Sequence, residues 1–243
     1  MLVAATFAPH PPLVVPEVAA GAAGELAVLR AACDRAVRRL LATGPDRVVV
    51  VGAGPAAARW ADGDSGSFAG YGVALDVPLG PGPAVGPPRM PLSATVGGWL
   101  LARAGYAGPR YAVTVPADVS DPELAGWARS VDSGGVHEGG FDGGGRLGLL
   151  VMGDGSARRS LAGPGYLDPR AEGFDAAVVR ALREGDPAGL RALDPALGAQ
   201  LLAAGVPAWR LAGQLGLSQT FQAELLYDDA PYGVGYLVAA WQV

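Results

Sequence analysis

A run of four valines at positions 48–51 limits most strongly what this chain can fold into. The run lies in the segment DRVVVVGAG, residues 46–54. A short, continuous apolar run indicates a strand covered on both faces, which is typical of parallel sheets. Residues 1–8 and 146–153 contain similar apolar segments, and helical patterns alternate with such strands along the chain. The sequence therefore predicts an α/β fold with a mostly parallel sheet and helices on both faces.

The segments between these strands support the same alternation. Apolar residues recur at helical spacing within residues 25–44, and Gly44 is expected to end that helix. We predict further strands over 71–79 and 109–116. Residues 78–91 are too rich in proline and glycine for regular structure and form a candidate lid.

The second half of the chain reads as several helices followed by two closing strands over residues 223–241. Three aspartates that precede proline are expected to cap helices, namely Asp121, Asp186 and Asp194. We find no internal repeat and no linker that would divide the chain. The prediction is a single domain over residues 1–243.

The composition excludes several classes of function. All 18 cationic residues are arginine, so Schiff-base and lysine-nucleophile chemistry is excluded. The net charge of -5 and the scattered arginines argue against a nucleic-acid partner. Cys33 is the one cysteine, which excludes an internal disulfide, and its helical surroundings predict a buried thiol. Residues 1–12 do not show the pattern of a secretory leader, and we find no membrane-length apolar run, so we expect a soluble cytoplasmic protein without a membrane partner.

Candidate functional residues lie in four loops that follow predicted strands. The loops are APHPP (8–12), GAGPAAARW (52–60), GDGSARRS (153–160) and YDDAPYG (227–233). Because the carboxyl ends of parallel strands meet at one edge of a sheet, the four loops are expected to form one pocket. The second loop lacks a complete G-x-G-x-x-G run and carries proline where a helix should begin, which argues against dinucleotide binding.

His10 is the candidate metal ligand or general base, because flanking prolines fix its backbone directly after a strand. The alternative is a structural histidine in a tight turn. His137 stands among glycines and reads as an exposed loop residue. Asp154 and Ser156 are the catalytic candidates, although the glycine-x-serine here is not a complete nucleophile elbow.

Four residues are candidates for ligand binding. Arg158 and Arg159 could hold an anionic ligand or pair with nearby carboxylates. Asp228 and Tyr232 lie in the last of the four loops. Asp228 and Asp229 would point to opposite faces of a strand, so at most one of them would face the pocket.

Four segments resemble the class III extradiol ring-cleavage dioxygenase superfamily, in its actinobacterial subunit-B-like branch. They are PHPPLVVPEV (9–18), VVVVG (48–52), GDGSARRS (153–160) and DAPYGVGY (229–236), and their order spans nearly the whole chain. The resemblance implies a three-layer α/β sandwich. It also implies a non-haem Fe(II) held by two histidines and one glutamate, with a further histidine as acid/base on a catechol-like substrate. Such a ligand set leaves positions open for substrate and O₂.

Carried over by position, the resemblance leaves this site incomplete. The first iron-binding histidine matches His10, whereas the second falls at Gly54 and the acid/base histidine falls at Ala157. The segment before Trp209, where the family has its glutamate, contains no acidic residue. The chain has two histidines in total, fewer than such an enzyme needs.

The sequence therefore favours a pseudo-enzyme that binds a small molecule or a protein partner and needs no cofactor. The alternative is a divergent enzyme, either a dioxygenase of aromatic diols or a hydrolase-like protein that uses His10, Asp154 and Ser156. In that case His10 would bind Fe(II) or another divalent metal together with carboxylates such as Glu17, Asp154 or Asp228, an oxygen-rich set suited to Mg or Mn. A third reading is a structural subunit of a catalytic partner. Homo- and hetero-oligomers both stay open.

Overall fold

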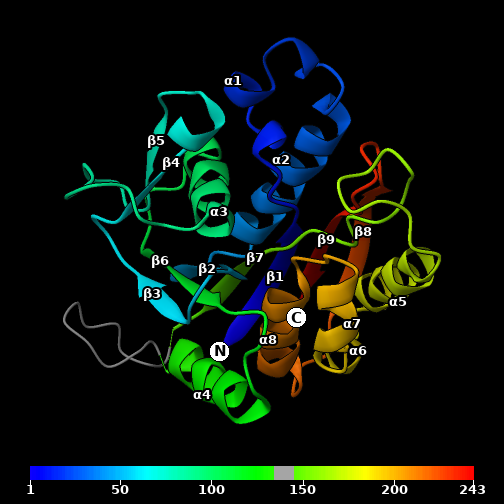
Figure 1. The fold of residues 1–243 in the computed structure, drawn as a ribbon. Helices are drawn as coiled ribbons and strands as arrows, with labels where there is room; N and C mark the ends of the chain where they lie inside the picture. The colour runs from blue at the N-terminus through cyan, green and yellow to red at the C-terminus, as the bar shows by residue number, and fades with distance from the viewer. Residues whose placement is uncertain (134–144) are drawn as a thin grey trace.

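A seven-stranded sheet runs through the computed structural model, which describes residues 1–133 and 145–243 (Figure 1). In spatial order its strands are β3 (Ala58–Trp60), β6 (Arg110–Val115), β2 (Arg47–Ala53), β7 (Leu147–Met152), β1 (Leu2–Ala8), β9 (Tyr236–Gln242) and β8 (Gln222–Asp229). The four strands β6, β2, β7 and β1 pair in parallel. β3 pairs antiparallel with β6, and β9 pairs antiparallel with both β1 and β8. The sheet is therefore mixed, with a parallel centre.

Helices cover both faces of this sheet (Figure 1). They are α1 (Pro16–Ala19), α2 (Ala27–Ala42), α3 (Leu92–Arg103), α4 (Asp121–Asp132), α5 (Arg170–Glu184), α6 (Pro187–Arg191), α7 (Pro195–Gln200) and α8 (Val206–Gly216). α2 and α3 pack on one face, and α4, α5 and α8 pack on the other. The α/β sandwich expected from the sequence is thus confirmed. No helix in the two described ranges has both the length and the apolar character to cross a membrane.

The four valines of β2 contribute side chains to the hydrophobic cores on both faces of the sheet. Val48 and Val50 pack toward α2 and α3, whereas Val49 and Val51 pack toward α4 and α8. All four side chains are fully buried, and each contributes about 1.5–3 kcal/mol of hydrophobic free energy. Because successive side chains of a strand point to opposite faces, and helices cover both faces here, every position of this strand must be apolar.

Local signals in the sequence are partly confirmed. Gly44 has a left-handed φ of 64° just beyond α2, as its predicted role as a helix terminator requires. Asp186 and Asp194 cap α6 and α7 through backbone N–H groups. The prediction that Asp121 caps α4 is wrong, because Asp121 is the first residue of the helix and Ser120 precedes it as the N-cap. Ser120 forms a capping box with Glu123, the helical residue three positions on.

The strand predicted over residues 71–79 is also largely wrong. Only Asp76–Pro78 forms a strand, β5, and it pairs with β4 (Ser65–Ser67) in a separate two-stranded sheet. A 3-10 turn that ends at Gly72, with φ of 82°, takes the place of the first residues of the predicted strand. The edge of the main sheet beside β6 is occupied by β3 instead. Residues 79–91 contain no helix or strand, as predicted.

Candidate functional site

The carboxyl ends of β1 and β7 mark the point where the chain changes sides of the sheet. These two strands are parallel neighbours. The long helix that follows β1, α2, packs on one face, and the helix that follows β7, α5, packs on the other. In open α/β sheets such a topological switch point opens a crevice at the strand ends, where ligands bind.

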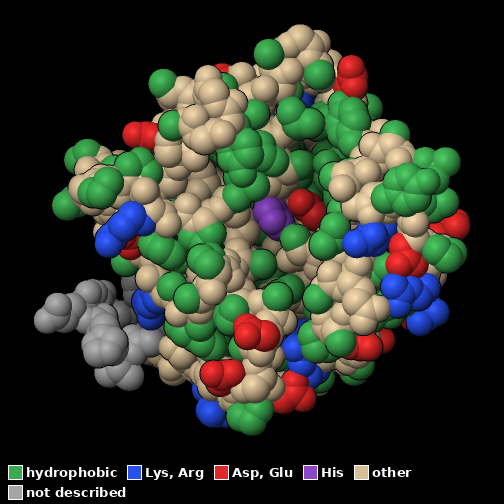
Figure 2. Space-filling model, in the orientation of Figure 1, with side chains coloured by type: hydrophobic (Ala, Val, Ile, Leu, Met, Phe, Trp, Pro, Cys, Tyr) green, Lys and Arg blue, Asp and Glu red, His purple; other side chains and the backbone are tan. Residues whose placement is uncertain are grey.

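His10 and Asp154 meet in this crevice. The His10 backbone N–H donates to Asp154 Oδ1 at 2.7 Å, and His10 Nδ1 lies 3.6 Å from the same oxygen. The side chains are 9% and 15% exposed, respectively. Figure 2 shows a histidine in a hollow of this face, next to an acidic side chain and surrounded by hydrophobic groups. The structure thus brings together the predicted metal ligand and one of the two predicted catalytic residues.

The segment around His10 is held rigidly. Pro9 and Pro11 fix the backbone on either side, and a 3-10 turn begins at Pro12. The His10 Nδ1 atom is buried and has no hydrogen-bond partner among the described residues. A buried polar atom without a partner costs free energy unless a ligand or water supplies the missing bond. Because Asp154 Oδ1 is 3.6 Å away, this nitrogen faces the carboxylate without a hydrogen bond to it, and the His10–Asp154 pair is the candidate binding site.

Ser156, in contrast, is part of the framework. Its side chain is fully buried, its hydroxyl donates to Leu201 O at 2.9 Å, and the Arg158 backbone N–H donates to the same hydroxyl at 3.1 Å. A nucleophile needs a free hydroxyl beside a base. The geometry therefore does not support Ser156 as the nucleophile of a hydrolase.

Asp175 on α5 is the residue that holds the 153–160 turn in place, and the sequence analysis missed it. One carboxylate oxygen accepts the Ser156 backbone N–H at 2.8 Å, and the other accepts from Arg159 Nη1 at 3.0 Å. Burial raises the pKa of Asp175 above its ordinary value, although the Ser156 N–H and the Arg159 charge act to lower it. Its position in the apolar stripe of α5, beside Phe174 and Val178, is the signal that identifies it.

The other predicted ligand-binding residues make structural contacts. Arg159 pairs with Asp175, which is the carboxylate pairing considered above, and Arg158 donates to Gly165 O at 2.6 Å. Tyr232 donates to Glu25 Oε2 at 2.6 Å across the molecular surface. Asp228 is exposed near the end of β8. These contacts give none of the four residues a position beside the His10–Asp154 pair.

The donor set of the crevice does not fit the iron site that the resemblance implies. Within residues 1–133 and 145–243, no three His, Cys, Asp or Glu side chains gather closely enough to hold a metal ion. His10 and Asp154 supply two donors, and neither Glu17 nor Asp228 completes a set of three with them. At Gly54 a Cβ atom would lie 2.9 Å from the Thr114 side chain, so a histidine there requires the backbone or Thr114 to move. His137 lies outside the described residues.

Buried groups below the crevice are also unsuited to metal binding. Burial, followed by the charges of Asp34 and Asp154, raises the pKa of Cys33 to about 12. Cys33 is therefore a protonated thiol at neutral pH, and its predicted burial is confirmed. Burial and the Asp154 charge likewise raise the pKa of Tyr236. Asp154 thus lies close to groups that stay uncharged.

An apolar cavity lies at the same edge of the sheet, between the ends of β2 and β6 and the helices α7 and α8. It has a volume of about 540 Å³ and is lined by Gly54 after β2, Ala117 after β6, and residues of α7 and α8. In the loop before α8, the Gly205 N–H donates to the backbone carbonyl of Asp154 at 2.8 Å. Neither His10 nor Asp154 lines the cavity. Ligand sites in proteins combine an apolar wall of this size with a few polar groups.

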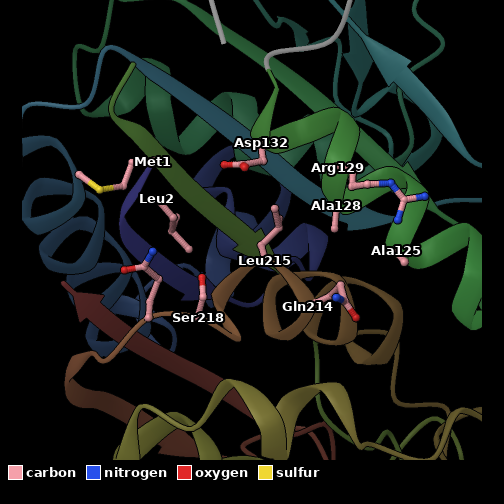
Figure 3. Close-up of a pocket in the computed structure, with 10 residues that line it drawn as sticks. Met1, Leu2, Ala125, Ala128, Arg129, Asp132, Gln214, Leu215 and Ser218 are labelled. Atoms are coloured by element: carbon pink, nitrogen blue, oxygen red, sulfur yellow. The ribbon is translucent and has the colours of Figure 1, made fainter. Parts of the chain in front are cut away.

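A second cavity, of about 620 Å³, lies at the opposite edge of the sheet. Figure 3 shows that it lies between the start of β1 at Met1 and Leu2, the side chains Arg129 and Asp132 of α4, and Gln214 near the end of α8. The amino ends of parallel strands rarely carry ligand sites in this class of fold. We therefore place the candidate site at the carboxyl edge.

Comparisons with known proteins bear on the fold alone. No protein-family model matches the sequence, and no curated protein matches it either. Among solved structures, the chain is similar to the uncharacterized protein JW3007 from Escherichia coli K12, with a TM-score of 0.50. The match covers 99% of this chain and 100% of that one at 14% sequence identity. This likeness supports an α/β sandwich and carries no assignment of function.

Proposed function

We propose that this chain is a non-catalytic small-molecule-binding protein with an extradiol dioxygenase subunit-B-like fold. The PHPP and GDGS segments, which carry the resemblance in sequence, lie at the ends of the neighbouring strands β1 and β7. They form one crevice through the hydrogen bond between His10 and Asp154. The fold and the position of the crevice are compatible with that superfamily.

One observation carries the proposal. His10 Nδ1 is a buried polar atom that lacks a partner among the described residues, whereas the crevice offers only Asp154 as a second donor. A free hydrogen-bonding atom favours a ligand. Two donors fall short of the three-residue facial set that iron-dependent ring cleavage uses.

Catechol binding and turnover, measured side by side, test the proposal. We expect calorimetry with iron-free protein to detect binding of catechol that becomes about tenfold weaker in His10→Ala. We expect no ring-opened product when Fe(II) and O₂ are added. Ring opening that is lost in His10→Ala would show that the protein is an enzyme.

The adjacency of His10 and Asp154 favours one alternative, a divergent metal-dependent enzyme that uses this pair. Imidazole nitrogen and carboxylate oxygen are both common metal ligands, and the two side chains lie 3.6 Å apart. This alternative requires further ligands from water or substrate. It predicts a divalent metal that binds the wild type and is lost in both His10→Ala and Asp154→Ala.

A further inference from the structure

The strand β8 (Gln222–Asp229) is an open edge of the main sheet. It pairs with β9 on one side, and within residues 1–133 and 145–243 no strand and no backbone group bonds to its other side. Arg35 Nη2 donates to the Leu226 carbonyl at 3.4 Å, which satisfies one group of the strand. Its eight residues include no proline, which would block pairing. Such an edge accepts a further strand.

The bulge at Leu226 makes β8 symmetric about Leu225. Leu225 lies opposite Ala239 of β9, and the register skips Leu226 before it resumes at Tyr227. Equal steps from Leu225 in the two directions therefore join residues on the same face of the sheet, namely Glu224 with Tyr227, Ala223 with Asp228, and Gln222 with Asp229. Because opposite residues of an antiparallel pair share a face, two copies of β8 match over their whole length around a two-fold axis at Leu225.

The charges of β8 favour this register. With the axis at Leu225, every carboxylate of the strand lies opposite an uncharged side chain of the second copy. An axis at Glu224 or at Asp228 would instead place two carboxylates opposite each other, which is unfavourable. The register that uses the whole strand is thus also one that keeps its like charges apart.

Arg39 on α2 adds a positive charge beside this register. It pairs with Glu224, and its side chain is 39% exposed. Arg39 and Gln222 line the same surface hollow of about 390 Å³. Because Gln222 lies opposite Asp229 of the second copy, that carboxylate would approach Arg39. The two-fold axis repeats this contact, so the paired edges are complementary in charge.

From this symmetry we infer that two copies of the chain join β8 to β8 in antiparallel orientation, so that their sheets become one continuous sheet. A second copy fits the edge better than an unrelated peptide does, because the strand's own sequence supplies an uncharged partner for each of its carboxylates. The inference concerns assembly and does not depend on the proposed function.

Disulfide trapping tests the register, because Cys33, the one cysteine of the chain, is buried. In Leu225→Cys the two new thiols face each other across the axis with their Cα atoms roughly 5 Å apart, which a disulfide spans. We expect oxidised Leu225→Cys to become a covalent dimer. Gln222→Cys, the matched control on the same strand, puts the thiols roughly 20 Å apart and should not cross-link.

Sedimentation equilibrium provides a second measurement at an exposed position of β8. Gln222→Arg places a cation opposite Asp229 of the second copy, whereas Gln222→Glu places a like charge there. We expect the wild type to dimerise, and the dissociation constant of the dimer to be at least about threefold lower in Gln222→Arg than in Gln222→Glu.

Circular dichroism checks that Leu225→Cys is folded, because Leu225 packs against the core. If it is not folded, the two charged Gln222 variants decide. A monomeric wild type, equal cross-linking of Leu225→Cys and Gln222→Cys, or equal dissociation constants for Gln222→Arg and Gln222→Glu would each overturn the inference.

Discussion

Asp154 ties the ends of β1 and β7 together, because its Oδ1 accepts the His10 backbone N–H at 2.7 Å. We predict that Asp154→Ala lowers the free energy of unfolding by about 1–3 kcal/mol, since a mostly buried N–H loses its acceptor. Asp154→Asn keeps a side-chain carbonyl in the same place and should lose less. Urea unfolding of the three proteins measures this, and equal losses in both variants would contradict the account.

Asp175 should give the protein a recognisable pH dependence. Burial raises the pKa of Asp175 above its ordinary 3.8, so the folded state binds this proton more tightly than the unfolded state does. Stability from this group is therefore present at low pH and is lost as pH rises from about 4 through the raised pKa. We predict that wild type loses stability relative to Asp175→Asn over this range. Urea unfolding at a series of pH values checks it; a wild-type stability that stays constant or rises relative to that of Asp175→Asn as pH increases would disprove it.

The sequence predicts part of the site at the level of residues. His10 and Asp154 directly follow recognisable strands, so their position at one sheet edge follows from the α/β pattern. The pairing of Arg159 with Asp175 depends on how α5 returns to the turn, which no local pattern encodes. Ser156 lies in a turn whose residues are typical of a catalytic turn, and only the burial of its side chain reveals its structural role.

At the scale of elements, α7 forms one wall of the apolar cavity and depends on its N-cap. Asp194 accepts from the backbone N–H groups of Ala196 and Leu197 at 2.8 and 3.3 Å. Asp194→Ala should lower the free energy of unfolding by about 1 kcal/mol, and Asp194→Asn, which still caps, by less. Thermal unfolding distinguishes the two variants. No change in Asp194→Ala would mean that packing alone holds this short helix.

The sequence predicts the start of a helix well where only one residue can act as its N-cap. Asp194 stands before proline and caps as expected. At α4 two cap residues are adjacent, and Ser120 takes the position because Glu123 completes its capping box. The short strand β5 pairs outside the main sheet, and its apolar pattern alone gives no indication of which edge it joins.

At the scale of the whole molecule, α8 packs on the sheet through close contacts between glycines. A Cβ atom on Gly153, at the end of β7, would lie 2.5 Å from Gly205 Cα. We predict that Gly153→Ala lowers the free energy of unfolding by about 1–3 kcal/mol through overpacking. Gly173→Ala, on α5 with nothing within 4 Å of its Cβ, is the matched control and should stabilise by about 0.5–1 kcal/mol. Equal unfolding midpoints for the two variants would contradict this packing.

The sheet order is the part of the fold that the sequence analysis did not predict. The first strand pairs with β7 in parallel and with β9 in antiparallel orientation, and both partners lie far away in the sequence. The alternation of strands and helices predicts a layered α/β fold but not which strands become neighbours. The topological switch point at His10 and Asp154 therefore emerges only from the assembled sheet.

The most direct test of the central claim is the metal content of the protein. Fe(II), Mn(II) or Zn(II) is added in turn to anaerobic, metal-free wild type and His10→Ala, the excess is removed, and the bound metal is counted per chain. Because the described part of the chain gathers only His10 and Asp154 as donors, the account predicts no stoichiometric metal in either protein. Close to one equivalent in the wild type that is lost in His10→Ala would contradict it and support the metal-dependent enzyme.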